Sequence, residues 1–197
     1  FSKDKYETFL ADLNSKHPGA IEFRVAETPI FIDKYFTRKL TDACESIIDV
    51  ITVPSFKRLT ERAIPGAERL PNENDFSHMI AFDFGICINE QYELEPQLIE
   101  MQGFPSLYGF QVYYPEIVNK HFEIPANYHQ YLGNYTKESY LQDLRELILG
   151  NQPAENVILL EIKPHTQKTR IDFYCTQDYL NIQPVCITEL IQEGKQL

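Results

Sequence analysis

The segment from residue 78 to residue 111 constrains the fold of this chain more than any other stretch. It holds two apolar runs, 80–88 and 98–102, which are joined by the polar connection 89–96. Phe82 and Phe84 fall on one side of the first run, and Asp83 falls on the other. This alternation predicts an antiparallel hairpin with one apolar face and one more polar face.

The more polar face of this hairpin carries three oxygen-bearing side chains. Asp83 lies in the first strand, and Glu100 and Gln102 occupy alternate positions of the second, so we expect them to share one surface. The same alternation puts Leu98 beside Glu100 and Ile99 on the other face. Two carboxylates and an amide oxygen suit a hard cation such as Mg²⁺ better than zinc. The alternative is that these side chains are simply solvated.

Acidic residues gather in the middle of the chain. Residues 71–161 hold 3 Lys or Arg and 14 Asp or Glu, a difference that equals the net charge of −11 of the whole chain. Such a field repels nucleic acids and anionic membranes, and it favours metal ions, amines or polyamines. Solubility alone is an alternative reason for this charge. We therefore expect small-molecule partners, no nucleic acid and no membrane.

Length and composition indicate an ordinary globular protein. The chain has 197 residues, 43% of them hydrophobic, which is enough for one domain or two small ones. It contains no apolar run long enough to span a bilayer and no signal-peptide pattern at its start. Its four Cys residues form no C-x-x-C pair and indicate structural thiols. These features predict a cytoplasmic location.

Three segments are expected along the chain. Residues 1–70 are predicted to be mainly helical, with helices at 3–14 and 33–50, a short helix after Pro54, and short β-rich runs at 20–25 and 29–32. Residues 71–133 hold the hairpin and a following helix, and the loop 64–76 marks the boundary. Residues 134–197 form the third segment.

The loop that leaves the hairpin is a candidate for substrate binding. Gly103 allows close approach of the backbone, and Ser106 opens a helix-like run whose first N–H groups offer an anion site. A plain strand-to-helix turn is the alternative. We expect the aromatic side of this helix, with Phe110 and Tyr114, to pack back on the hairpin, and Pro115 to kink or end the helix.

The third segment shows a β-α-β pattern. A helix over 136–149 precedes the apolar run 156–162, expected to be a strand buried on both faces, and then come a helix around 166–180 and a strand at 184–188. Such strands should be parallel. His165, Lys168 and Arg170 follow the first strand, where ligands often bind in α/β sheets. A solvated basic loop is the alternative.

These segments together predict an α/β fold, or α+β with a mixed sheet. Its parts would be a helical N-terminal third, a central antiparallel hairpin and a C-terminal β-α-β unit with parallel strands.

The hairpin segment resembles a known enzyme family. Its residues, DFGICINEQYELEPQLIEMQGFPSLYGF, are similar to the element D-F-x…K-L-x-E-x-N-x-x-x-P-[TS] of circularly permuted ATP-grasp ligases of the glutathionylspermidine synthase-like type. Residues 156–197 resemble the strand-helix-strand module of the same family, so residues 134–197 look like a pre-ATP-grasp-like module that is truncated at its C-terminal end. The resemblance covers residues 79–197.

The resemblance implies an enzyme that uses ATP and Mg²⁺ to activate a small carboxylate as an acyl phosphate. An amine would then displace the phosphate and form an amide. Asp83, Glu100 and Gln102 would match the magnesium ligands of the family, and Ser106 would match a residue near the acid substrate. The chain would be the amino-terminal portion of such a ligase, inactive alone, with the ATP-holding lysines and the adenine pocket in a downstream catalytic domain.

Two departures from the family pattern leave a second function open. The family has a phosphate-contacting Arg where this chain has Ala81, and an Asn where it has Gln102. The first function is the portion of a carboxylate-amine ligase that contributes contacts to magnesium, phosphate and substrate. The second is a non-catalytic ATP-grasp-related binding or scaffold domain.

Overall fold

The structure, a computed structural model, describes residues 2–72, 74, 77–103 and 107–195. The mixed α/β class predicted from the sequence is confirmed, with an antiparallel hairpin and a parallel strand pair in separate sheets. The chain divides into two compact units. Residues 31–105 form the hairpin unit, and residues 1–30 with 106–197 form the helical unit. These boundaries are not those of the three sequence segments, because residues 1–30 belong with the second half of the chain.

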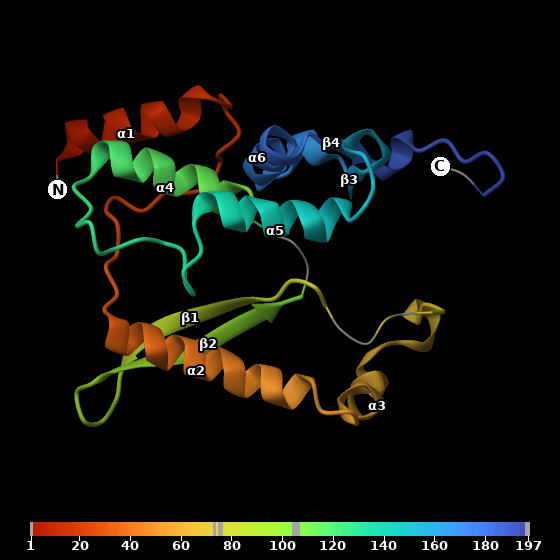
Figure 1. Cartoon of the computed structure of the whole chain (residues 1–197), viewed down its shortest axis with the longest axis horizontal. Helices are drawn as coiled ribbons and strands as arrows, with labels where there is room; N and C mark the ends of the chain where they lie inside the picture. Colours follow the sequence, from red (N-terminus) through yellow and green to blue (C-terminus); the bar gives the residue numbers. More distant parts are fainter. Residues whose placement is uncertain (1, 73, 75–76, 104–106, 196–197) are drawn as a thin grey trace. The chain divides into compact units, whose positions relative to one another are not determined.

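In the hairpin unit, a long helix packs on a two-stranded sheet (Figure 1). Helix α2 (Lys34–Ile51) begins where the Asp33 carboxylate accepts a hydrogen bond from the Phe36 N–H at 2.7 Å. The Lys39 ammonium donates to the Leu94 carbonyl at 3.1 Å and so ties α2 to the second strand. The other elements of this unit are α3 (Phe56–Thr60), 3₁₀ turns at Glu61–Ala63 and Gly66–Glu68, β1 (Ala81–Ile88) and β2 (Leu94–Gln102).

Strands β1 and β2 pair antiparallel as predicted, but a β-bulge interrupts them. Asp83 lies opposite Glu100 while Phe84 lies opposite Leu98, which leaves Ile99 as the extra residue. Leu98 therefore shares a face with Phe84. The Ile99 Cδ1 lies 3.7 Å from the position that a Cβ of Gly85 would take. Plain alternation places Leu98 on the face of Glu100 and Ile99 on the other face. That prediction is wrong, because the bulge shifts the register.

The hairpin is longer and more open than its sequence indicates. Residues 94–96, expected in the connection, pair with 86–88, and Pro96 is tolerated because β2 is an edge strand. Apolar side chains near the turn face solvent, since Ile88 is 68% exposed and Leu94 is 52% exposed. Among the described residues of this unit, Phe36 is the one buried hydrophobic side chain. The candidate metal ligands therefore stand on an open surface.

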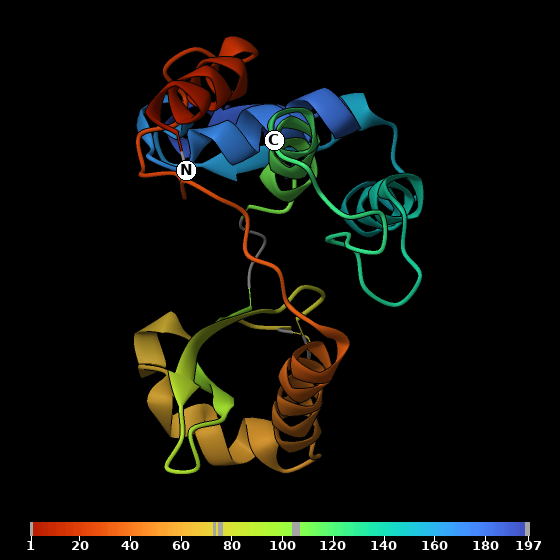
Figure 2. The same cartoon turned by 90° about the vertical axis from the view of Figure 1, so that its left-hand side faces the viewer.

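The helical unit is built around α4 (Phe110–His121), which packs against α1 (Lys3–Ser15) and α6 (Arg170–Leu180) (Figure 2). The Phe9 ring is fully buried and meets the Tyr114 ring edge-on, with 6.1 Å between the centroids. The aromatic side of α4 thus packs on α1, where the sequence led us to expect the hairpin. The core cluster comprises Phe9, Leu13, Ala20, Val25, Phe110, Tyr113, Ile117, Val118, Ile171 and Cys175.

Two further local predictions for the helical unit are corrected. Residues 20–32, expected to hold short strands, form none, and Ala20 and Val25 instead fill the core between helices. Pro115 does not end α4, which continues to His121. A proline removes one hydrogen bond from a helix, and the packing of α4 on both sides outweighs that loss.

The β-α-β pattern is confirmed by β3 (Ile158–Glu161) and β4 (Gln183–Cys186), which pair in parallel on either side of α6 in the chain. The expectation that the first strand is buried on both faces is wrong. Burial alternates along β3, and Ile158 and Leu160 are 42% and 46% exposed. Among the described residues this sheet has two strands, too few to be enclosed like a larger parallel sheet.

Helix α5 (Lys137–Leu149) starts with a reciprocal cap. The Thr136 hydroxyl accepts from the Ser139 N–H at 3.3 Å, and the Ser139 hydroxyl accepts from the Thr136 N–H at 2.9 Å. The Arg145 guanidinium donates to the Tyr179 carbonyl at 2.6 Å and ties α5 to α6. Within the described part of the chain, no helix is both long and apolar enough to cross a membrane.

Loss of this cap should weaken the helical unit measurably. Thr136→Ala is expected to lower the free energy of unfolding by about 1 kcal/mol, because an N–H at the start of α5 loses its acceptor. Urea denaturation followed by circular dichroism measures the change. Thr136→Ser keeps the hydroxyl and should retain most of the stability, and an equal loss in both variants would contradict the capping role.

Candidate functional site

The hairpin brings the three predicted oxygen-bearing side chains together. Asp83 and Glu100 are Cα partners, and directly opposed residues of an antiparallel pair present their side chains on the same face. Gln102 lies two residues further along β2, and its Nε2 donates to Glu100 Oε1 at 2.6 Å. Asp83 and Glu100 are exposed, and Gln102 is half-buried. These side chains form a small oxygen-rich surface, named here the hairpin site.

The oxygen atoms of the hairpin site suit a hard cation that is bound partly by the protein and partly by phosphate oxygens. Mg²⁺ usually takes one or two carboxylates from a protein and fills its other positions with water and phosphate oxygens. Asp83 and Glu100 supply that number. Among the residues that the structure describes, no three His, Cys, Asp or Glu side chains gather into a group that could hold a metal ion. A cation at this site would therefore depend on ligand phosphates as well as on the protein.

The loop after β2 was predicted to contribute Gly103 and Ser106. The Ser77 hydroxyl lies 2.5 Å from the Gly103 carbonyl oxygen and fastens the end of β2. A Cβ at Gly103 would lie 3.5 Å from the Ser77 Oγ, an ordinary contact, so space does not demand glycine there. Ser106 lies outside the described residues. Substrate binding by Gly103 and Ser106 stays a prediction.

The anion predicted at the start of the following helix is a side chain of the protein itself. The Phe110 N–H donates to the Asp172 carboxylate at 2.8 Å. Hydrogen bonds from the N–H groups of Leu107 and Gly109 also favour the charged form of this carboxylate. Burial raises the pKa of Asp172, and these backbone N–H groups oppose the rise. Asp172 on α6 thus takes the place that a bound phosphate would have at the beginning of α4.

His165 and Lys168 lie on the loop between β3 and α6, as predicted. The His165 Nδ1 is 3.1 Å from the Tyr174 hydroxyl, and its ring stacks on the Tyr174 ring at 5.9 Å between centroids. The His17 ring also lies near Tyr174, with 5.4 Å between the ring centroids. Lys168 is exposed. His165 therefore packs against α6 through the Tyr174 ring.

Arg170 is engaged in holding the helical unit together. Its side chain, 12% exposed, donates to the carbonyls of Gly19 and Gln167 and pairs with Glu22 at 2.5 Å. The hydrogen bond from Arg170 holds the pKa of Glu22 below its usual range. These contacts fasten the start of α6 to the segment after α1. His165 and Arg170 thus make structural contacts, and Lys168 is exposed.

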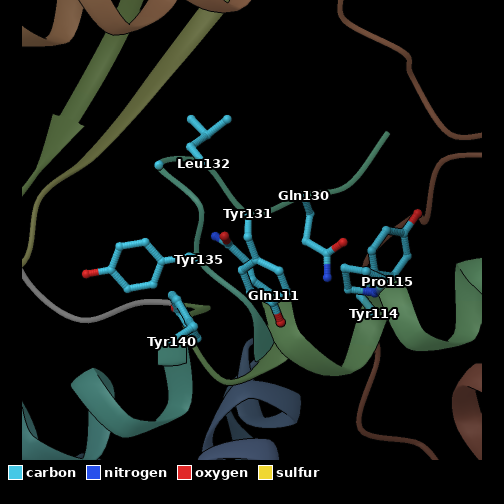
Figure 3. Close-up of a pocket in the computed structure, with 9 residues that line it drawn as sticks. Gln111, Tyr114, Pro115, Gln130, Tyr131, Leu132, Tyr135 and Tyr140 are labelled. Carbon is cyan, nitrogen blue, oxygen red and sulfur yellow. The ribbon is translucent and has the colours of Figure 1, made fainter. Parts of the chain in front are cut away.

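A cavity that the sequence did not indicate lies in the helical unit (Figure 3). Its volume is about 510 Å³, and its walls come from α4, the loop 130–135 and the start of α5. No motif marks it, because its walls are separated in sequence and carry neither charges nor metal ligands. Its one sequence signal is the tyrosine-rich stretch 128–140. The lining residues are Gln111, Tyr114, Pro115, Gln130, Tyr131, Leu132, Gly133, Tyr135 and Tyr140.

The tyrosines of this cavity are held in place and stay protonated. The Tyr140 hydroxyl donates to the Tyr108 carbonyl at 3.2 Å, and burial raises the pKa of Tyr140 strongly. The Tyr135 hydroxyl donates to the Asp143 carboxylate at 2.5 Å, which raises the pKa of Tyr135. Burial also raises the pKa of Tyr131, with a smaller opposing effect of the nearby Gln130 amide. These hydroxyls are therefore neutral hydrogen-bonding groups at physiological pH.

Comparison of the chain with protein-family models, with curated proteins and with solved structures finds no match in any of the three. Support for a function therefore comes from the residues themselves: the hairpin site and the tyrosine-lined cavity.

Proposed function

We propose that this chain is the amino-terminal portion of an ATP-grasp-like carboxylate-amine ligase and contributes contacts to magnesium, phosphate and substrate. The observation that carries the proposal is the pairing of Asp83 with Glu100, joined by Gln102 through its hydrogen bond to Glu100. The motif resemblance requires side chains at these positions to act together. A register shifted by one residue would have separated them onto opposite faces.

Each residue of the hairpin site has a distinct role in this proposal. Asp83 and Glu100 hold the cation, and Gln102 orients the Glu100 carboxylate by donating to its Oε1. When bound, magnesium would supply positive charge to phosphate oxygens during phosphoryl transfer from ATP to a carboxylate. The amine that then displaces the phosphate is attracted by the acidic middle of the chain. Substrate-binding roles for Gly103, Ser106, His165, Lys168 and Arg170 belong to the same proposal. So does a downstream catalytic domain that completes the enzyme.

Position 81 supports a second function, a non-catalytic ATP-grasp-related binding or scaffold domain. Ala81 is the Cα partner of Gln102, at the edge of the hairpin site, and its methyl group offers no charge to a phosphate. The start of α4, another place where phosphate could bind, is filled by Asp172. A site without these contacts holds nucleotide less strongly, as expected of a relative that keeps the fold without the reaction.

Titration with Mg²⁺–ATP separates the two functions. We expect the chain to bind Mg²⁺–ATP weakly, with a dissociation constant of about 1 mM, because two carboxylates supply only part of the contacts. NMR chemical shifts of the amides in β1 and β2 would report the binding. Asp83→Ala and Glu100→Ala should each abolish the magnesium-dependent part of these shifts.

Glu90→Ala is the matched control, because Glu90 is an exposed acid in the turn of the same hairpin. It should bind as the wild type does. Magnesium-dependent shifts that survive in both Asp83→Ala and Glu100→Ala would remove the ligase proposal. A wild-type chain that ignores Mg²⁺–ATP would favour the scaffold function.

A further inference from the structure

The tyrosine-lined cavity of the helical unit has the dimensions and walls of a small-molecule site. Its volume of about 510 Å³ lies within the range of ligand pockets in proteins. Most of its surface is apolar, because four tyrosine rings, a proline and a leucine contribute to it. Among the residues that the structure describes, no charged side chain lines it. Figure 3 shows the rings and the two glutamine side chains that surround it.

Ring surfaces in the cavity are held ready to stack on a flat ligand. The Tyr131 and Tyr140 rings lie 5.7 Å apart between centroids, tilted by 42°. The hydroxyls of Tyr140 and Tyr135 are bound to the Tyr108 carbonyl and to Asp143, so both rings are fixed at their far ends. A ligand therefore meets rings whose positions are already set, which lowers the entropy lost on binding.

The cavity also carries polar groups suited to the edge of a ring. Gln111 and Gln130 each present a side-chain amide, which places a donor next to an acceptor. Pro115 has no N–H, so the backbone carbonyl of Gln111 lacks the helical donor four residues further on. A ring with a donor and an acceptor side by side on its edge can pair with the glutamine amides.

We infer that this cavity binds a small, uncharged aromatic ring that carries a donor and an acceptor side by side on its edge. The tyrosine rings stack on its faces, and the glutamine amides pair with its edge as glutamine pairs with adenine. An anion is disfavoured because no cation lines the cavity and the chain carries a net charge of −11. This chemistry occurs in nucleobases and in single-ring carboxamides. The inference does not depend on the ligase proposal, since every lining residue belongs to the helical unit.

Three probes test the chemistry and its source. Adenine represents a nucleobase, benzamide represents a single-ring carboxamide, and N,N-dimethylbenzamide has the same ring without the donor. Saturation-transfer NMR and calorimetry with the chain should detect adenine or benzamide, and the dimethyl compound should bind about tenfold more weakly because its edge lacks the N–H. The tighter of the first two identifies the source. Equal binding of the dimethyl compound, or no binding of either ring, overturns the inference.

Variants locate the binding in this cavity. Gln111→Ala and Gln130→Ala change exposed side chains and should leave the fold intact, as thermal unfolding would verify. Each should weaken binding of the preferred probe about tenfold. Gln142→Ala is the matched control, an exposed glutamine on α5 that does not line the cavity, and it should have no effect. Undiminished binding in both cavity variants would place the ligand elsewhere and overturn the inference.

Discussion

Gly109→Ala is expected to lower the free energy of unfolding by about 3 kcal/mol, the upper end of the usual loss for overpacking a core. Gly109 is buried at the start of α4, where the backbone of α6 comes closest. A Cβ there would lie 2.6 Å from the Thr176 Oγ1 and 2.8 Å from the Thr176 backbone nitrogen. Backbone atoms inside a helix cannot give way, so α4 and α6 must separate.

Chemical denaturation followed by tyrosine fluorescence measures this loss. The matched control is Gly66→Ala, because a Cβ at Gly66 meets nothing within 4 Å and its φ is not positive. That variant should change stability by less than about 0.5 kcal/mol. A Gly109→Ala protein as stable as the control would show that the two helices are not packed as closely as the structure has them.

Asp172→Ala is also expected to lower the free energy of unfolding by a large amount, about 3 kcal/mol. Asp172 is 6% exposed, and its carboxylate accepts the Phe110 N–H at 2.8 Å and is acted on by the N–H groups of Leu107 and Gly109. Alanine leaves these buried donors without an acceptor. Asp172→Asn keeps one carbonyl acceptor and should lose clearly less, when both are compared by urea denaturation at pH 7. Equal losses would contradict the capping role of the carboxylate.

Asp172 also predicts a pH dependence of stability. Burial raises its pKa above the ordinary 3.8, so the folded protein takes up a proton more readily than the unfolded chain. Its contribution is therefore most favourable below pH 3.8 and is lost as the pH rises through the raised, folded-state pKa. The stability of wild type relative to Asp172→Asn should fall over that interval. A difference that rises with pH there would mean that the N–H groups outweigh burial.

The sequence predicted those elements whose pattern is local. Alternation around Asp83 predicts β1, because burial on one face imposes a period of two. The apolar run 156–162, the helix after it and the second apolar run predict the parallel β3–β4 pair. The shared face of Asp83 and Glu100, in contrast, depends on the bulge in β2. Continued from Phe84 opposite Leu98 without a bulge, the register would place Asp83 opposite Ile99 and turn Glu100 to the other face.

Features that depend on distant parts of the chain were not predictable in this way. The bulge at Ile99 reverses the faces of two residues, and a sequence with several apolar neighbours allows either register. The role of Asp172 requires α6 to reach the start of α4, and these segments lie 62 residues apart. The tyrosine-lined cavity needs three segments to meet, and Tyr, Gln and Pro at its walls match no motif. Such features follow from packing, which single-sequence patterns do not contain.

The most direct test of the hairpin site replaces Mg²⁺ with Mn²⁺, which accepts the same oxygen ligands and broadens nearby NMR signals. Submillimolar Mn²⁺ with ATP should broaden first the amide signals of residues 82–84 and 99–102, and this selective broadening should disappear in the Asp83→Asn, Glu100→Gln double variant. Broadening centred on other acids, or unchanged in the double variant, would contradict the claim that Asp83 and Glu100 hold a divalent cation.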